Sequence, residues 1–255
     1  MSKLQQSDKP LSVFLHIPKT GGTALTKEIT SGMLSSESLG LYSSRLFIKD
    51  VLSDHLNKLT DERRHALRYL YGHSVYYGIH SLIGRAEARY HTFLREPATL
   101  YVSLYNHALM KLGERDVDYR AEPMIDNGRI LSFEEWFQRQ TRSHSLQTRF
   151  TWSFWYGKQQ SKATPTILKE AKKVLHKFSV IGFTEQFDAS ARLISEELGV
   201  SKKVFGKHNV SPRYYNPRDI NEVKELMTSQ GAQCDLELYD YARQLQSSRS
   251  VSNDQ

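Results

Sequence analysis

The stretch SVFLHIPKTGGTAL, residues 12–25, decides the fold of this chain. Residues 13–17 are a short apolar run that favours a strand, and Pro18 ends it because proline has no N–H for the neighbouring strand. Two glycines follow, and a helix is predicted over 23–33. A strand, a glycine-rich turn and a helix N-terminus together predict an anion site, because backbone N–H groups and the positive end of the helix dipole converge there.

Lys19 adds an ammonium group to this turn, and Thr20 and Thr23 add hydroxyls. The standard nucleoside-triphosphate loop, G-x-x-x-x-G-K-[ST], carries its lysine after the second glycine. Here Lys19 precedes both Gly21 and Gly22. For residues 19–22, KTGG, taken alone, a tight turn with a solvated lysine would be the simpler interpretation. The flanking strand and helix favour an anion site.

Composition indicates a soluble globular protein whose 255 residues suffice for one large domain or two small ones. The formal net charge of +7 favours an anionic ligand, or simply a basic solvated surface, and the scattered cations argue against a nucleic-acid-binding tail. Cys234 is the single cysteine, which excludes an intrachain disulfide and a cysteine-pair zinc site. With no bilayer-length apolar run and no signal-peptide core, a cytoplasmic location is expected.

Short strands alternate with helices along the chain, which predicts a three-layer α/β fold with a central parallel sheet of about four to five strands. Further strands are expected at 70–77, 91–95 and 179–183. Further helices are expected at 61–70, from 97 through 109, after Ser132, and at 165–178, 187–198, 217–229 and 235–245. Residues 11–246 are expected to form a single domain between a flexible N-terminus (1–10) and a disordered tail (247–255), with 113–130 as a mobile lid or insert.

Arg95 is expected at the carboxyl end of its strand, which is where ligands bind in open α/β sheets. Pro97 suits the first turn of the next helix, and Ser103 follows Arg95 by eight residues, two helical turns in. Both side chains can therefore reach one phosphate, the arginine with a planar pair of donors and the serine with a hydroxyl. An ion pair between Arg95 and a neighbour such as Glu96 is the alternative.

His73 follows Gly72 at the end of a strand-like segment. A neutral histidine can take a proton from a hydroxyl near physiological pH, which makes His73 a candidate general base. The chain has ten histidines. Those that compete with His73 on sequence alone are His16, His80, His91 and His107.

Together these segments resemble carbohydrate-type sulfotransferases, the group of the heparan sulfate 2-O-sulfotransferase relatives and bacterial sulfotransferase family 2. Residues 16–23, HIPKTGGT, resemble the 5′-phosphosulfate loop of that family, and 93–105 resemble its 3′-phosphate motif. Residues 70–73, LYGH, resemble the segment with its catalytic histidine. Residues 181–187 resemble its strand-to-helix segment beside the adenine, and 208–211 its late nucleotide-contacting loop; the likeness runs from about 12 to 245.

The resemblance implies a P-loop-like sulfotransferase fold and an enzyme that moves a sulfuryl group from 3′-phosphoadenosine 5′-phosphosulfate (PAPS) to an acceptor, leaving adenosine 3′,5′-bisphosphate (PAP). It implies a glycan or glycolipid hydroxyl as acceptor, His73 as the base, and no metal and no nucleic acid as partners. Arg95 and Ser103 would bind the 3′-phosphate. The residues that it implies for the 5′-phosphosulfate are Lys19, Thr20, Gly21, Gly22, Thr23 and Ala24. Those that it implies for the rest of the nucleotide are Phe183, Asn209 and Ser211.

Two positions depart from the family pattern. Leu100 stands where family members often carry an arginine, so a charged contact near the cofactor or a partner helix is missing. Tyr71 stands where some relatives have a second histidine, which concerns acceptor positioning. The rival interpretations are a nucleotide kinase using ATP and magnesium, which would need its lysine after the last glycine, and a non-enzymatic module that binds a nucleotide or a nucleic acid.

Overall fold

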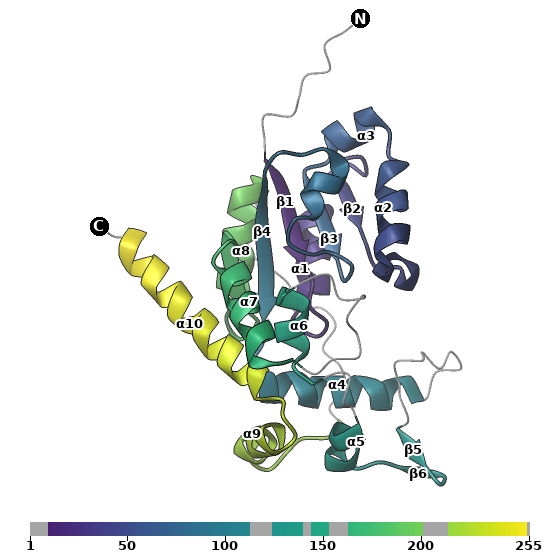
Figure 1. The fold of residues 1–255 in the computed structure, drawn as a ribbon, viewed down its shortest axis with the longest axis vertical. Helices are drawn as coiled ribbons and strands as arrows, with labels where there is room; N and C mark the ends of the chain where they lie inside the picture. The colour runs from purple at the N-terminus through teal and green to yellow at the C-terminus, as the bar shows by residue number, and fades with distance from the viewer. Residues whose placement is uncertain (1–9, 113–123, 140–143, 153–162, 201–213, 254–255) are drawn as a thin grey trace, which may run out of the picture.

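A parallel five-stranded sheet forms the centre of the computed structural model, which describes residues 10–112, 124–139, 144–152, 163–200 and 214–253 (Figure 1). The strand order is β2-β3-β1-β4-β7, so β1 lies in the middle. The strands are β1 (Leu11–Leu15), β2 (Ser38–Gly40), β3 (Tyr69–Gly72), β4 (Ala88–Leu94) and β7 (Val180–Phe183). Every residue of β1 is buried, as expected for a strand covered on both faces of a parallel sheet.

Helices cover both faces of the sheet, which confirms the predicted three-layer α/β fold. On one face, α1 (Gly22–Thr30) and α8 (Phe187–Leu198) pack against Phe14 and Phe93. Val13 and Leu15 point to the other face because side chains alternate along a strand. That face is covered by α2 (Lys49–Asn57), η2 (Ile79–Ile83), α6 (Leu146–Trp152), α7 (Pro165–Leu175) and α10 (Gln233–Asn253).

A second apolar core lies beyond the carboxyl edge of the sheet. Figure 1 shows α4 (Pro97–Leu112) crossing that edge, with α5 (Phe133–Arg139), α9 (Ile220–Ser229) and the hairpin β5 (Ile125–Asp126) and β6 (Arg129–Ile130) on its far side. The buried residues of this core include Tyr101, Tyr105 and Trp136. Ser132 and Glu135 form a capping box at the start of α5, each side chain bonded to the other's N–H. The remaining short elements are η1 (Ser44–Phe47), α3 (Asp61–Ala66) and η4 (Thr184–Gln186).

Several element boundaries differ from the prediction. The first strand begins and ends two residues early, at Leu11 and Leu15, and α3 ends at Ala66 because residues 69–72 pair with β1 instead. The last helix does not end at Leu245 but continues to Asn253, so the predicted tail from 247 is helical over its first seven residues. The single domain over 11–246 stays a prediction. The lid also stays a prediction, because residues 113–123 lie outside the described residues. No helix in the described part of the chain is long and apolar enough to cross a membrane.

Candidate functional site

Four loops leave the sheet at one edge, and hydrogen bonds there join the loop after β1 to His73 and to Arg95. The strand ends are aligned there, because Leu15 pairs with both Gly72 and Thr92, and Leu94 pairs with Phe183. The chain turns from β1 towards β2 on one side and from β4 towards β7 on the other. The order of the strands therefore reverses between β1 and β4, and such a point is where open α/β sheets bind ligands.

The loop after β1 has a fixed, unusual backbone. Lys19 and Gly21 have positive φ angles of 66° and 89°. The Thr20 hydroxyl donates to the Ile17 carbonyl at 2.8 Å, and the Thr184 hydroxyl donates to the Thr20 carbonyl at 2.7 Å. A Cβ on Gly22 would lie 2.2 Å from Cδ2 of His16, so the imidazole occupies the space that a side chain would need. Glycine is required at 22 for this close approach.

The loop delivers an uncapped helix N-terminus to the edge of the sheet. No side chain of the described residues caps α1. The N–H groups of Ala24 and Leu25 bond to the Gly21 carbonyl, whereas those of Gly22 and Thr23 have no partner among the described residues. Two N–H donors and the positive end of the helix dipole are therefore available to an anion. The N–H of Ala24, which is also a predicted phosphosulfate residue, is by contrast already bonded to the Gly21 carbonyl.

Lys19 and Arg95 lie side by side at this helix end, although 76 positions separate them. Nη1 of Arg95 donates to the Lys19 carbonyl at 3.1 Å, and its Nε donates to the Thr99 hydroxyl at 3.3 Å. Burial, and then the charge of Arg95, lower the pKa of Lys19. Two half-buried cations placed together favour a bound group with negative charge, because it offsets their repulsion.

Ser103 follows Thr99 by four residues on α4, so both lie on the same face of that helix. Ser103 is half-buried. Arg95 thus reaches the turn of α4 immediately before Ser103, and their joint binding of a phosphate stays a prediction. Leu100, which stands where family members often carry an arginine, is fully buried in the main core.

His73 is oriented by the loop itself. Its Nδ1 lies 2.7 Å from the His16 carbonyl oxygen, which can only accept a hydrogen bond. Nδ1 therefore carries a proton, so Nε2 is the nitrogen with the lone pair when the imidazole is neutral. The ring planes of Tyr42 and Phe150 are nearly perpendicular to the imidazole, at centroid distances of 4.9 and 6.5 Å. This tautomer suits a general base.

His16 and Tyr42 complete the surroundings of His73, and neither was among the predicted site residues. The Tyr42 hydroxyl lies 2.7 Å from Nδ1 of His16, whose ring centroid is 4.5 Å from that of His73. Burial, and then His73, hold the pKa of His16 well below its usual value, so His16 is neutral. The sequence did hold a signal for His16, because it lies in the loop motif of residues 16–23. Tyr42 had none, because the sequence does not show that its loop returns to β1.

The residues predicted for the remainder of the nucleotide are not brought to this edge in the same way. Phe183 is fully buried, and its ring packs against Tyr239 and, at 4.9 Å, the Arg243 guanidinium. Phe187, four residues later, has its ring against Gly21. Asn209 and Ser211 lie outside the described residues.

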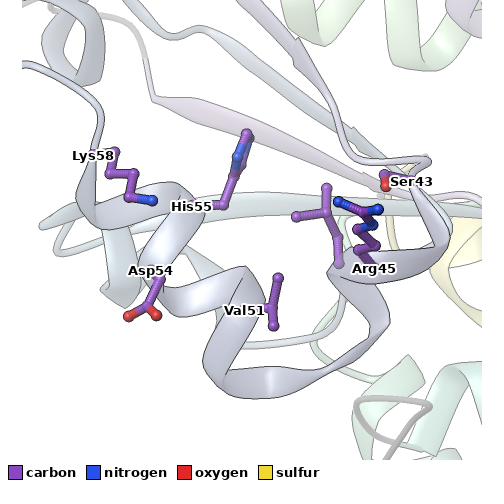
Figure 2. A pocket seen from close by; sticks show the side chains of 7 residues that line it. Ser43, Arg45, Val51, Asp54, His55 and Lys58 are labelled. Atoms are coloured by element: carbon purple, nitrogen blue, oxygen red, sulfur yellow. The ribbon is translucent and has the colours of Figure 1, made fainter.

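A separate groove of about 350 Å³ lies between η1 and α2 (Figure 2). Its residues carry the charges of Arg45, Lys58 and Asp54, and it begins at Ser43, next to Tyr42 in the chain. None of the predicted site residues that the structure describes lines it. The described residues include no group of three or more His, Cys, Asp or Glu side chains that could hold a metal ion.

Comparison with known proteins adds only distant likenesses among solved structures. No family model matches the chain, and no curated protein does. Among solved structures, the crystal structure of a sulfotransferase from Alicyclobacillus acidocaldarius is similar over 91% of this chain and 96% of that one, with 13% sequence identity and a TM-score of 0.44. At this distance the likeness does not identify the chain, so the functional argument depends on the site.

Proposed function

We propose that this protein is a sulfotransferase that moves a sulfuryl group from PAPS to an acceptor hydroxyl. One observation carries the proposal: the uncapped N-terminus of α1, the adjacent cations Lys19 and Arg95, and a histidine with a basic Nε2 share one edge of the sheet. This set can bind an anionic donor and deprotonate a hydroxyl beside it. The motif resemblance supplies the identity of the donor.

In this proposal the donor is bound through its two anionic ends. Lys19 and the N–H groups of Gly22 and Thr23 bind the 5′-phosphosulfate, and Arg95 and Ser103 bind the 3′-phosphate. The hydrogen bond from Arg95 to the Lys19 carbonyl supports this division, because it links the two phosphate positions. Phe183, Asn209 and Ser211 stay predictions for the adenosine.

The transfer breaks the bond between sulfur and the bridging oxygen of the donor and forms a bond from sulfur to the acceptor oxygen. Nε2 of His73 takes the acceptor proton, and PAP leaves with the bridging oxygen. Lys19 neutralises the charge that develops on that oxygen. As in phosphoryl transfer, the protein contributes positioning and charge stabilisation.

The acceptor proposed is a carbohydrate or glycoconjugate hydroxyl. The rings of Tyr42 and Phe150 beside His73 support it, because they present apolar surface next to the base. Further along the chain, Trp152 packs against the main core, and Trp155 and Tyr156 lie outside the described residues.

The proposal is tested by comparing the unfolding temperature with PAP and with ATP plus magnesium. We expect PAP to stabilise the protein by about 3 kcal/mol at 100 times its dissociation constant, and ATP with magnesium to do less. A nucleotide kinase would show the opposite order. A nucleic-acid binder would instead bind random oligonucleotides with a steep salt dependence.

Arg95→Ala tests the 3′-phosphate assignment by calorimetry with PAP. We expect roughly tenfold weaker binding or more, because a charge-assisted phosphate contact is lost. Arg192→Ala is the matched control, since Arg192 is an exposed arginine on α8. Unchanged PAP affinity in Arg95→Ala would refute the assignment.

A further inference from the structure

The backbone of Arg95 is held by a residue that the proposed function does not use. Gln147 on α6 is only 1% exposed. Its Oε1 accepts the Arg95 N–H at 2.9 Å, and its Nε2 donates to the Arg95 carbonyl at 2.8 Å. A primary amide offers an acceptor and a donor in one plane, so one side chain satisfies both backbone groups.

These two hydrogen bonds, the Gln147 clamp, take the place of strand pairing where β4 ends. The pairing of β4 with β7 stops at Leu94 and Phe183. Arg95 is the next residue, and its partly buried backbone groups no longer have a strand partner in that pairing. Gln147 supplies both, so the chain leaves β4 in one fixed direction.

The helix that carries Gln147 is fixed in turn by Asp235 of α10. The two Asp235 oxygens accept the N–H of Gln147 at 3.0 Å and both the N–H and hydroxyl of Thr148, at 2.7 and 2.8 Å. Asp235 is fully buried. The same helix places Phe150 against His73. One rigid helix therefore contacts both the cation and the base of the site.

We propose that Gln147 is a positioning residue that aims the Arg95 guanidinium at the bound donor. The inference rests on the proposed function, but Gln147 itself does not touch the donor. Without the clamp the Arg95 backbone is free to rotate, and its side chain no longer stays beside Lys19 and Thr99. Donor affinity is then lost through Arg95 alone.

The test is a double-mutant cycle on PAP binding with Gln147→Met and Arg95→Ala. We expect Gln147→Met to weaken PAP binding about tenfold in the wild-type background and by less than twofold when Arg95 is already alanine. Thr148→Val is the matched control, because it removes a hydrogen bond to Asp235 from the same buried cluster without touching Arg95. It should lower stability and leave PAP affinity within twofold.

Equal losses in both backgrounds would show a merely structural role and overturn the proposal. Normal PAP binding by Gln147→Met would overturn it too, while leaving the proposed function intact, because the wild type would still bind PAP. If Gln147→Met does not fold, the isosteric Gln147→Glu replaces it in the cycle. Amide exchange of the wild type adds a test without any variant: rapid exchange at the Arg95 N–H would contradict the clamp.

Discussion

Lys19 combines a strained backbone with the cation proposed for the leaving group. Its φ of 66° lies in the left-handed region, which costs a lysine on the order of 1 kcal/mol. Its carbonyl accepts the Arg95 hydrogen bond in this conformation. Backbone and side chain therefore serve the site separately, and one substitution can separate them.

We expect Lys19→Gly to keep the stability of the protein and abolish most of its turnover. Glycine adopts the left-handed conformation freely, so the free energy of unfolding should change by less than about 1 kcal/mol. Loss of the ammonium should lower kcat by roughly 10²-fold or more. Urea unfolding and steady-state kinetics measure the two effects.

Lys27→Gly is the control with the opposite outcome. Lys27 is exposed on α1, where glycine costs about 1 kcal/mol, and it makes none of the proposed donor contacts. We expect lower stability with normal turnover. If Lys19→Gly retained wild-type kcat, Lys19 would not be the stabiliser of the leaving group.

His73→Ala should separate chemistry from donor binding. We expect kcat to fall roughly 10²-fold or more, because the acceptor proton has no base, while the PAP dissociation constant stays within about twofold. His80→Ala is the matched control. His80 lies on η2, and its ring bonds to the Tyr90 hydroxyl rather than to the loop after β1. A large loss of PAP affinity in His73→Ala would assign His73 to the donor instead.

At the scale of elements, the contact of α6 with α10 carries a pH-dependent contribution to stability. Burial raises the pKa of Asp235 to about 6, and hydrogen bonds from Thr148, Gln147 and Tyr101 oppose that shift. The folded protein therefore binds the proton more tightly than the unfolded chain, whose aspartate titrates near 4. Stability from this group rises as the pH falls from above 6 towards 4.

We expect the wild type to gain about 1 kcal/mol relative to Asp235→Asn between pH 7 and pH 5. The comparison uses the slope of unfolding free energy against pH, so that other titrating groups cancel and the lower absolute stability of the variant does not matter. Parallel slopes for the two proteins would mean that Asp235 has an ordinary pKa in the folded state.

Elements with a local signal could be predicted, and those defined by packing could not. Pro97 marks the start of α4, and Gly199, with φ of 64°, closes α8 where the sequence placed its end. By contrast, residues 146–151 of α6 are all buried, so the helix has no polar face and no apolar period. The strand β2 has only three residues, too few for an alternating pattern.

The candidate site shows the same division. The loop of residues 16–23 could be found because strand, glycines and helix are contiguous. The contacts that complete the site join residues far apart in the chain, His73 to His16 and Arg95 to Lys19. They depend on the strand order β3-β1-β4, which alternation of strands and helices does not specify. Gln147 and Tyr42 depend on it too.

At the scale of the whole molecule, convergence of the loops at one sheet edge predicts which segments a ligand protects. The site draws on the loops after β1 and β4, whereas α2 and the β5–β6 hairpin contribute none of the proposed donor contacts. A ligand at this edge should therefore affect segments that are distant in sequence and leave others unchanged.

Hydrogen exchange with and without PAP tests this arrangement. We expect slower exchange at 18–25 and 95–103, because the N–H groups of Gly22 and Thr23 gain an acceptor and Arg95 and Ser103 become fixed. Exchange at 49–57 and 124–130 should stay the same. In Arg95→Ala, PAP should protect 95–103 less than it does in the wild type and should still protect 18–25, because only the 3′-phosphate contact is removed. Protection centred on 43–58 would instead place the nucleotide in the groove between η1 and α2, away from Lys19 and His73.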